Sequence, residues 1–92
     1  MFTMITDHPL RVISRQLCAA ANAATDRAKE NDTPSSHLLA AKIADAASCC
    51  LTELELAGQR LPGDRDAELQ FIVNANFHRE KIPEARSRIE RG

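Results

Sequence analysis

Two helix-breaking signals divide this chain of 92 residues and constrain what it can fold into. Thr33 followed by Pro34 is an N-cap with proline at the first helical position, which marks the start of a new helix. The Pro62-Gly63 pair is a turn signal, and Asp64 after it can cap a further helix. Apolar residues three and four positions apart fill the segments between these breaks, so the sequence predicts an all-α protein.

The first helix is predicted over residues 7–30, after a short extended arm over residues 1–6. Asp7 is a good N-cap, and Pro9 is tolerated in the first turn because its missing N–H has no partner there. The arm, "MFTMIT", is β-prone but has no second strand to pair with. The apolar stripe of the first helix comprises Leu10, Ile13, Leu17, Ala20 and Ala24.

The second helix is predicted over residues 34–57, with Gly58 supplying the left-handed residue that commonly closes a helix. This helix is apolar around most of its circumference, so we expect it to be the central element, contacted on more than one side. Its main stripe is Leu39, Ile43, Ala46, Cys50, Leu54 and Ala57; a second row is Leu38, Cys49 and Leu56; the other flank holds Ala40, Ala44, Ala47 and Leu51.

A third helix is predicted over residues 64–81, and Pro83 should end or kink it because the residue before a proline avoids the α region. A last short helix then covers residues 83–91. The stripe of the third helix is Leu69, Ile72, Val73 and Phe77, with Phe71 and Ala75 beside it. Because helices joined by short loops usually pack antiparallel, we expect a single domain: an antiparallel hairpin of two long helices plus one or two shorter C-terminal helices.

The chain has few large side chains with which to stabilise a monomer. Apolar residues make up 43% of the sequence, but many of them are alanines. The sequence has three phenylalanines and neither tyrosine nor tryptophan. Burial contributes roughly 25 cal/mol per Å² of apolar surface, so we expect self-association or a protein partner. No apolar stretch approaches the ~20 residues of a membrane span, and the first residues do not resemble a secretory signal, so a cytoplasmic location is expected.

The three cysteines do not form a disulfide framework, because their number is odd and their spacing irregular. Cys49 and Cys50 are neighbours on a helix, so their side chains point about 100° apart and cannot converge on one metal ion. Cys50 lies in the main stripe and is expected to fill the core, whereas Cys49 belongs to the second row. Cys18 is expected to be a partly exposed residue on the first helix.

No pattern for catalysis, a metal or a cofactor is found. His8, His37 and His78 lie far apart in the sequence and match no short metal-binding spacing, and we expect His37 at the surface. The glycines do not form a phosphate-binding loop. We therefore expect no enzyme activity, no metal and no cofactor.

His8, Arg11 and Arg15 share a face at the N-terminus of the first helix. The helix dipole and the free N–H groups at a helix start favour negative charge, so these residues are a candidate site for a small anionic ligand such as a nucleotide. The alternative is a solvated polar face without a ligand.

The C-terminal segment is mildly basic, although the formal net charge of the chain is −1. Glu84 and Arg88 are spaced for an ion pair along a helix, which indicates that part of this charge is compensated within the segment. Acidic residues at the start of the third helix would repel phosphates, so nucleic-acid binding is not expected. The basic tail consists of Arg79, Lys81, Arg86, Arg88 and Arg91.

These features favour a small non-enzymatic helical module that binds a protein partner, itself, or both, in the manner of an inhibitor, adaptor or chaperone. The second row, Leu38, Cys49 and Leu56, is the expected contact surface. Two alternatives remain: an oligomeric module that binds or sequesters an anionic ligand through His8, Arg11 and Arg15, and a DNA-binding regulator whose third helix enters the major groove.

Overall fold

The computed structural model describes residues 8–91, and within that range it contains three α-helices and no strand. They are α1 (Pro9–Glu30), α2 (Pro34–Leu56) and α3 (Asp64–Arg91). The prediction of an all-α protein is confirmed. The predicted N-terminal arm and Asp7 lie outside the described residues.

The first two helices begin with caps that their sequences supply. α1 starts at Pro9, and its N-cap is His8, not Asp7: the Nδ1 atom of His8 accepts a hydrogen bond of 3.1 Å from the backbone N–H of Leu10. At the start of α2, the Thr33 and Ser36 side chains each bond the other's backbone N–H, and Pro34 follows the cap. Such reciprocal capping satisfies two donors that a helix start otherwise leaves unpaired.

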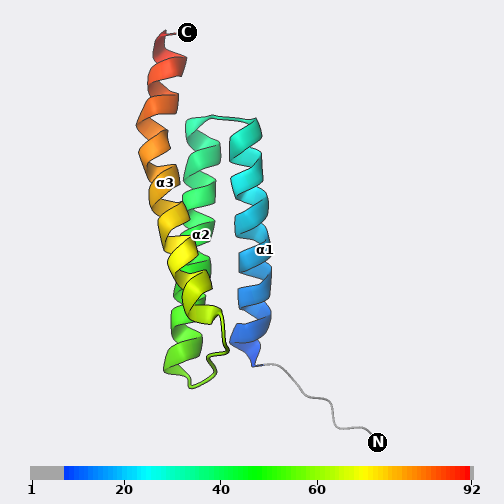
Figure 1. Cartoon of the computed structure of the whole chain (residues 1–92). Helices are drawn as coiled ribbons and strands as arrows, with labels where there is room; N and C mark the ends of the chain where they lie inside the picture. Colours follow the sequence, from blue (N-terminus) through cyan, green and yellow to red (C-terminus); the bar gives the residue numbers. More distant parts are fainter. Residues whose placement is uncertain (1–7, 92) are drawn as a thin grey trace, which may run out of the picture.

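α2 lies between the other two helices and contacts both of them extensively. Figure 1 shows α1 and α2 side by side in opposite directions, with α3 along α2 and extending beyond the connection between α1 and α2. The described chain spans 63 × 25 × 15 Å, and its radius of gyration is 15.9 Å. A compact domain of this length has a radius of gyration of about 12 Å, so the molecule is elongated.

Alanines form the centre of the buried face of α2. Ala40, Ala44 and Ala47 are buried, whereas Leu39 and Ala46 of the predicted main stripe are exposed. The prediction therefore misplaced the centre of the buried face, although Cys50 and Leu54 are buried as expected. Small side chains let neighbouring helices approach closely, and here they do so on both sides of α2. The main core cluster is Ala21, Ala44, Ala47, Leu51, Leu54, Phe71 and Ala75.

α3 turns its predicted apolar stripe outward. Leu69, Ile72 and Val73, which we call the outer stripe, are 52%, 40% and 61% exposed. Phe77, the fourth residue of the predicted stripe, is also exposed. The side chains that α3 buries are Phe71, Ala75, His78 and Ala85, because the Phe71 ring and Ala75 fit against the alanines of α2.

α3 is the longest helix, with 28 residues, and it continues through Pro83. The predicted helix end at residue 81 and the separate short helix over residues 83–91 are therefore wrong, and so is the expectation that the C-terminal helices are the shorter ones. A proline inside a helix removes one backbone hydrogen bond. Pro83 is exposed, so water can satisfy the carbonyl that loses its partner.

Candidate functional site

Two buried histidines meet where α2 and α3 pack together. His37 and His78 are 4% and 1% exposed, and their Nδ1 atoms lie 3.0 Å apart. The expectation that His37 lies at the surface is wrong. Packing of α2 against α3 brings these side chains together across 41 positions of sequence.

The histidine pair belongs to a longer chain of polar side chains. On one side, His37 Nε2 lies 2.5 Å from the carboxylate of Asp32, which also accepts a hydrogen bond from Arg88. On the other side, His78 Nε2 lies 3.1 Å from the hydroxyl of Thr25 on α1. Asp32 lies in the connection between α1 and α2, so these hydrogen-bonded side chains link that connection to all three helices. We call it the polar relay: Thr25, His78, His37, Asp32 and Arg88.

The geometry of the polar relay fixes its proton arrangement when both imidazoles are neutral. His37 donates its Nε2–H to the Asp32 carboxylate, so its Nδ1 must accept. His78 then donates its Nδ1–H to His37, and its Nε2 accepts the proton of the Thr25 hydroxyl. Among the described residues, no buried side-chain nitrogen or oxygen is without a hydrogen-bond partner.

Burial and charge oppose proton binding by His78 but favour the ionised form of Asp32. Burial lowers the pKa of His78, and its electrostatic interactions with His37 and Lys29 lower it further. The hydrogen bond from His37, followed by the charge of Arg88, lowers the pKa of Asp32. The polar relay therefore combines a histidine that resists protonation with a carboxylate that stays charged.

A groove between α1 and α3 runs over the polar relay. Two neighbouring hollows share Lys29, Phe77 and His78 in their linings. Positive side chains in the groove are balanced by Asp26, Asp32 and Glu84, so it does not present one sign of charge. Within residues 8–91, no group of three or more His, Cys, Asp or Glu side chains is arranged to hold a metal ion.

Arg11, the central residue of the predicted anion site, joins α1 to the start of α3. Its guanidinium donates to both carboxylate oxygens of Asp64, at 3.0 and 2.8 Å, and to the backbone carbonyl of Gln59 at 3.0 Å. These hydrogen bonds lower the pKa of Asp64. His8 accepts the capping hydrogen bond, and Arg15 is exposed. A ligand anion at this face would have to compete with Asp64 for Arg11.

The second row of α2 is exposed along its whole length: Leu38 and Leu56 are 48% and 74% exposed, and Cys49 lies between them. All three cysteines have free thiols. The Cys50 thiol donates to the carbonyl of Leu10 at 3.3 Å, and burial raises the pKa of both Cys50 and Cys18. Cys49 is therefore the most exposed of the three thiols, and Cys18 is partly exposed, as predicted.

The second row of α2 continues onto α3. Two side-chain contacts cross the edge between these helices: Thr52 donates to Glu68, and Arg79 pairs with Asp45 at 2.6 Å. Cys49 lies about one turn from both Asp45 and Thr52 on α2, and Ile72 of the outer stripe lies about one turn from Glu68 on α3. The second row and the outer stripe therefore border the same seam and form one surface, which we call the outer face.

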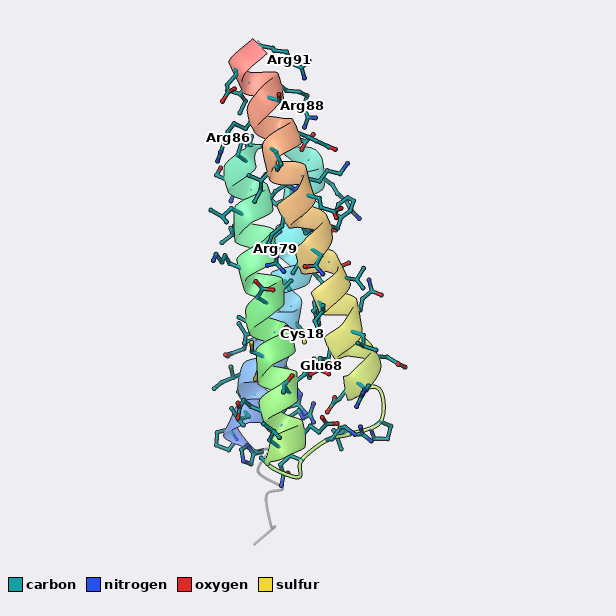
Figure 2. All side chains as sticks on the ribbon, turned by 90° about the vertical axis from the view of Figure 1, so that its left-hand side faces the viewer. Cys18, Glu68, Arg79, Arg86, Arg88 and Arg91 are labelled. Carbon is teal, nitrogen blue, oxygen red and sulfur yellow. The ribbon has the colours of Figure 1, made fainter. Side chains whose placement is uncertain are left out.

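Much of the charge of the basic tail is paired. Lys81 pairs with Glu84 at 3.3 Å and Arg88 pairs with Asp32, so the predicted Glu84–Arg88 pair is replaced by two others. Arg79 pairs across the seam, and Arg91 donates to the carbonyl of Ser87 at 3.3 Å. Figure 2 shows Arg86, Arg88 and Arg91 near the C-terminal end of α3 and Arg79 farther down the helix. These side chains mainly belong to local ion pairs and hydrogen bonds.

Comparisons of the chain with protein-family models, curated proteins and solved structures find no match. None of the helices within residues 8–91 combines the length and the apolar character needed to cross a membrane. Local motifs gave no sign of the polar relay. Its one sequence signal is spacing: His37 precedes Ala40 and Ala44, and His78 follows Ala75, at intervals that place each histidine among buried alanines.

Proposed function

We propose that this protein is a non-enzymatic helical module that acts by protein binding, and that the outer face of α2 and α3 joins two copies of the chain. The observation that supports this proposal is the outer stripe of α3, whose three large apolar side chains are 40–61% exposed. Single exposed apolar residues are normal on a protein surface, but a contiguous apolar patch marks an interaction site.

The charges at the ends of the outer stripe favour a second copy as the partner. Arg65 and Glu80 are exposed on α3, equally far along the sequence from the Ile72–Val73 pair. Arg65 also pairs with Glu55 of α2 at 3.7 Å, and in the proposed contact it exchanges this exposed pair for Glu80 of the other copy. If two α3 helices pack antiparallel about that point, Arg65 of each copy meets Glu80 of the other. Such a contact is self-complementary, as a two-fold interface requires. Asn76 lies within the same face and would restrict the register of the two helices.

A pair of valine-to-glutamate variants tests this proposal. Val73→Glu places a charge in the outer stripe and should reduce the mass measured by light scattering to that of the monomer, with helix content unchanged. Val12→Glu is the matched control, because Val12 is exposed on α1 and lies outside the outer face. It should keep the wild-type mass. A wild-type chain that is monomeric at all concentrations, or a Val73→Glu variant with the wild-type mass, would contradict the proposal.

Leu56→Glu tests whether the second row of α2 belongs to the same interface. Leu56 is 74% exposed, so a glutamate there leaves the fold of one chain intact. We expect weaker association than in the wild type, because α2 contributes the border of the contact and α3 its centre. An unchanged association constant would limit the interface to α3.

A further inference from the structure

The polar relay has a property that association through the outer face does not use. We propose that His37 and His78 form one proton-binding site, which holds a single added proton while α3 is docked and releases the C-terminal half of α3 when a second proton binds. This inference depends only on the polar relay and on how α3 is attached, and it is independent of the outer face.

One added proton can be accommodated without losing a hydrogen bond. It binds to Nδ1 of His37, which then donates to Nδ1 of His78 across the same 3.0 Å. His78 stays neutral but changes tautomer: its single proton is now on Nε2 and not on Nδ1, and Nε2–H donates to the Thr25 oxygen. His37 becomes an imidazolium beside the carboxylate of Asp32, at 2.5 Å. Both nitrogens of both rings keep their partners.

A second proton cannot be accommodated in this geometry. It would place an N–H on both Nδ1 atoms, so that two donors face each other across 3.0 Å, and it would leave two buried positive charges side by side. Isolated buried charges are strongly unfavourable. The rings must therefore separate before both can be protonated.

The charged groups around the rings do not compensate a second proton. α1 contributes Lys29 and Asp26 to the groove, and α3 contributes Lys81, Glu84 and Arg88. Asp32, from the connection before α2, already pairs with Arg88, and Glu84 pairs with Lys81. The cations repel the added charge, while two of the three carboxylates are already engaged.

The two halves of α3 are attached by different contacts. Phe71 and Ala75 hold its N-terminal half in the main core cluster, and Asp64 is bound to Arg11. Beyond residue 77, the buried side chains of α3 are His78 and Ala85, and the ion pairs of Arg79 with Asp45 and of Arg88 with Asp32 are both exposed. Separation of the histidines therefore loosens the C-terminal half and leaves the N-terminal half docked.

The released form binds one proton more than the docked form. Below the ordinary histidine pKa of about 6.5, the ratio of released to docked chains should therefore rise about tenfold for each unit by which the pH falls. Hydrogen exchange of the full-length protein measures this ratio. As the pH falls from about 6.5 to 5, protection factors of amides in residues 78–91 should therefore fall, relative to those in α1, toward a limit of about tenfold for each pH unit.

Two histidine variants make the test specific. In His78→Gln, His37 can still hold one proton beside Asp32, so the added pH dependence should disappear. His8→Asn is the matched control: it removes the histidine outside the pair and keeps a side chain suited to the N-cap, so the wild-type dependence should remain. Equal pH dependence in the wild type and in His78→Gln would overturn the proposal.

Nitrogen-15 spectra of the imidazole rings provide a second measurement on the unmodified protein, which decides the matter if His78→Gln fails to fold. In the docked state, we expect one added proton shared by His37 and His78. Spectra showing both rings doubly protonated, while amides of residues 78–91 remain protected, would also overturn the proposal.

Discussion

Replacing Ala47 by leucine should destabilise the protein, whereas the same replacement at Ala46 should have little effect. Ala47 is 0% exposed and belongs to the main core cluster with Phe71 and Ala75, whereas Ala46 is exposed on the other side of α2. The two positions are adjacent in one helix, so they share helix context and differ in burial. Alanine and leucine also have similar helix propensities, so the difference between the variants reports packing.

The magnitude follows from the lack of space beside Ala47. Leucine adds three carbons at a point where α2 and α3 pack through small side chains, so the helices must separate or the side chain must adopt a strained rotamer. Overpacking of this kind costs about 1–3 kcal/mol. In a domain of fewer than 100 residues, each kcal/mol lowers Tm by roughly 4–8 °C. An exposed substitution such as Ala46→Leu should change stability by at most about 0.5 kcal/mol.

Urea unfolding followed by circular dichroism measures both variants. The experiment should be repeated at several protein concentrations, because self-association makes apparent stability depend on concentration. If Ala46→Leu were the destabilised variant and Ala47→Leu retained wild-type stability, the buried face of α2 would be the main stripe indicated by the sequence pattern, and packing of the alanine flank against α3 would be refuted.

Three further predictions concern separate parts of the molecule. A double-mutant cycle with Arg11→Gln and Asp64→Asn should give a coupling free energy of about 1 kcal/mol in urea unfolding, the upper end for ion pairs near a surface. Because Arg11 lowers the pKa of Asp64, this coupling should be present above about pH 4 and lost as the pH falls further. A coupling independent of pH would contradict this prediction. A thiol reagent should modify Cys49 rapidly and Cys50 only on unfolding, as read by mass spectrometry after digestion, and equal rates would show that Cys50 is not buried. Pro83→Ala should restore a backbone hydrogen bond and raise hydrogen-exchange protection of residues 83–91, whereas unchanged protection would indicate that proline does not limit this part of α3.

The positions of the helices were largely encoded in local sequence signals. Thr33 and Pro34 start α2 where predicted, and Asp64 after the Pro-Gly turn starts α3. Capping and turn preferences act over a few residues, so they can be read without knowing the fold. Pro83 shows the limit of this reading, because an exposed proline can be accommodated in a helix whose lost hydrogen bond faces water.

The choice of buried face was decided by tertiary packing. Periodicity shows which residues share a side of a helix, but α2 has apolar residues on several sides, and pattern alone favoured the side with Leu39 and Ala46. The structure instead buries the alanine flank, because closely packed helices require small side chains between them. The same preference turns the outer stripe of α3 away from α2.

The anion and partner residues illustrate the same division. Helical spacing puts Leu38, Cys49 and Leu56 on one side of α2, and all three side chains are exposed. It also grouped Arg11 with His8 at the start of α1. The ion pair between Arg11 and Asp64 depends on where the start of α3 lies relative to α1. The spacing of residues within α1 carries no information about that position.

The sequence by itself determined that this chain forms helices, where most of them begin, and which residues of each helix lie on one side. Only the tertiary structure decided which sides face each other, and it thereby created the polar relay from a histidine of α2, a histidine of α3 and a carboxylate between α1 and α2. The physical reason is the sequence separation over which each kind of interaction acts. Caps and periodicity act within a few residues, whereas the meeting of His37 and His78 depends on the register of two packed helices.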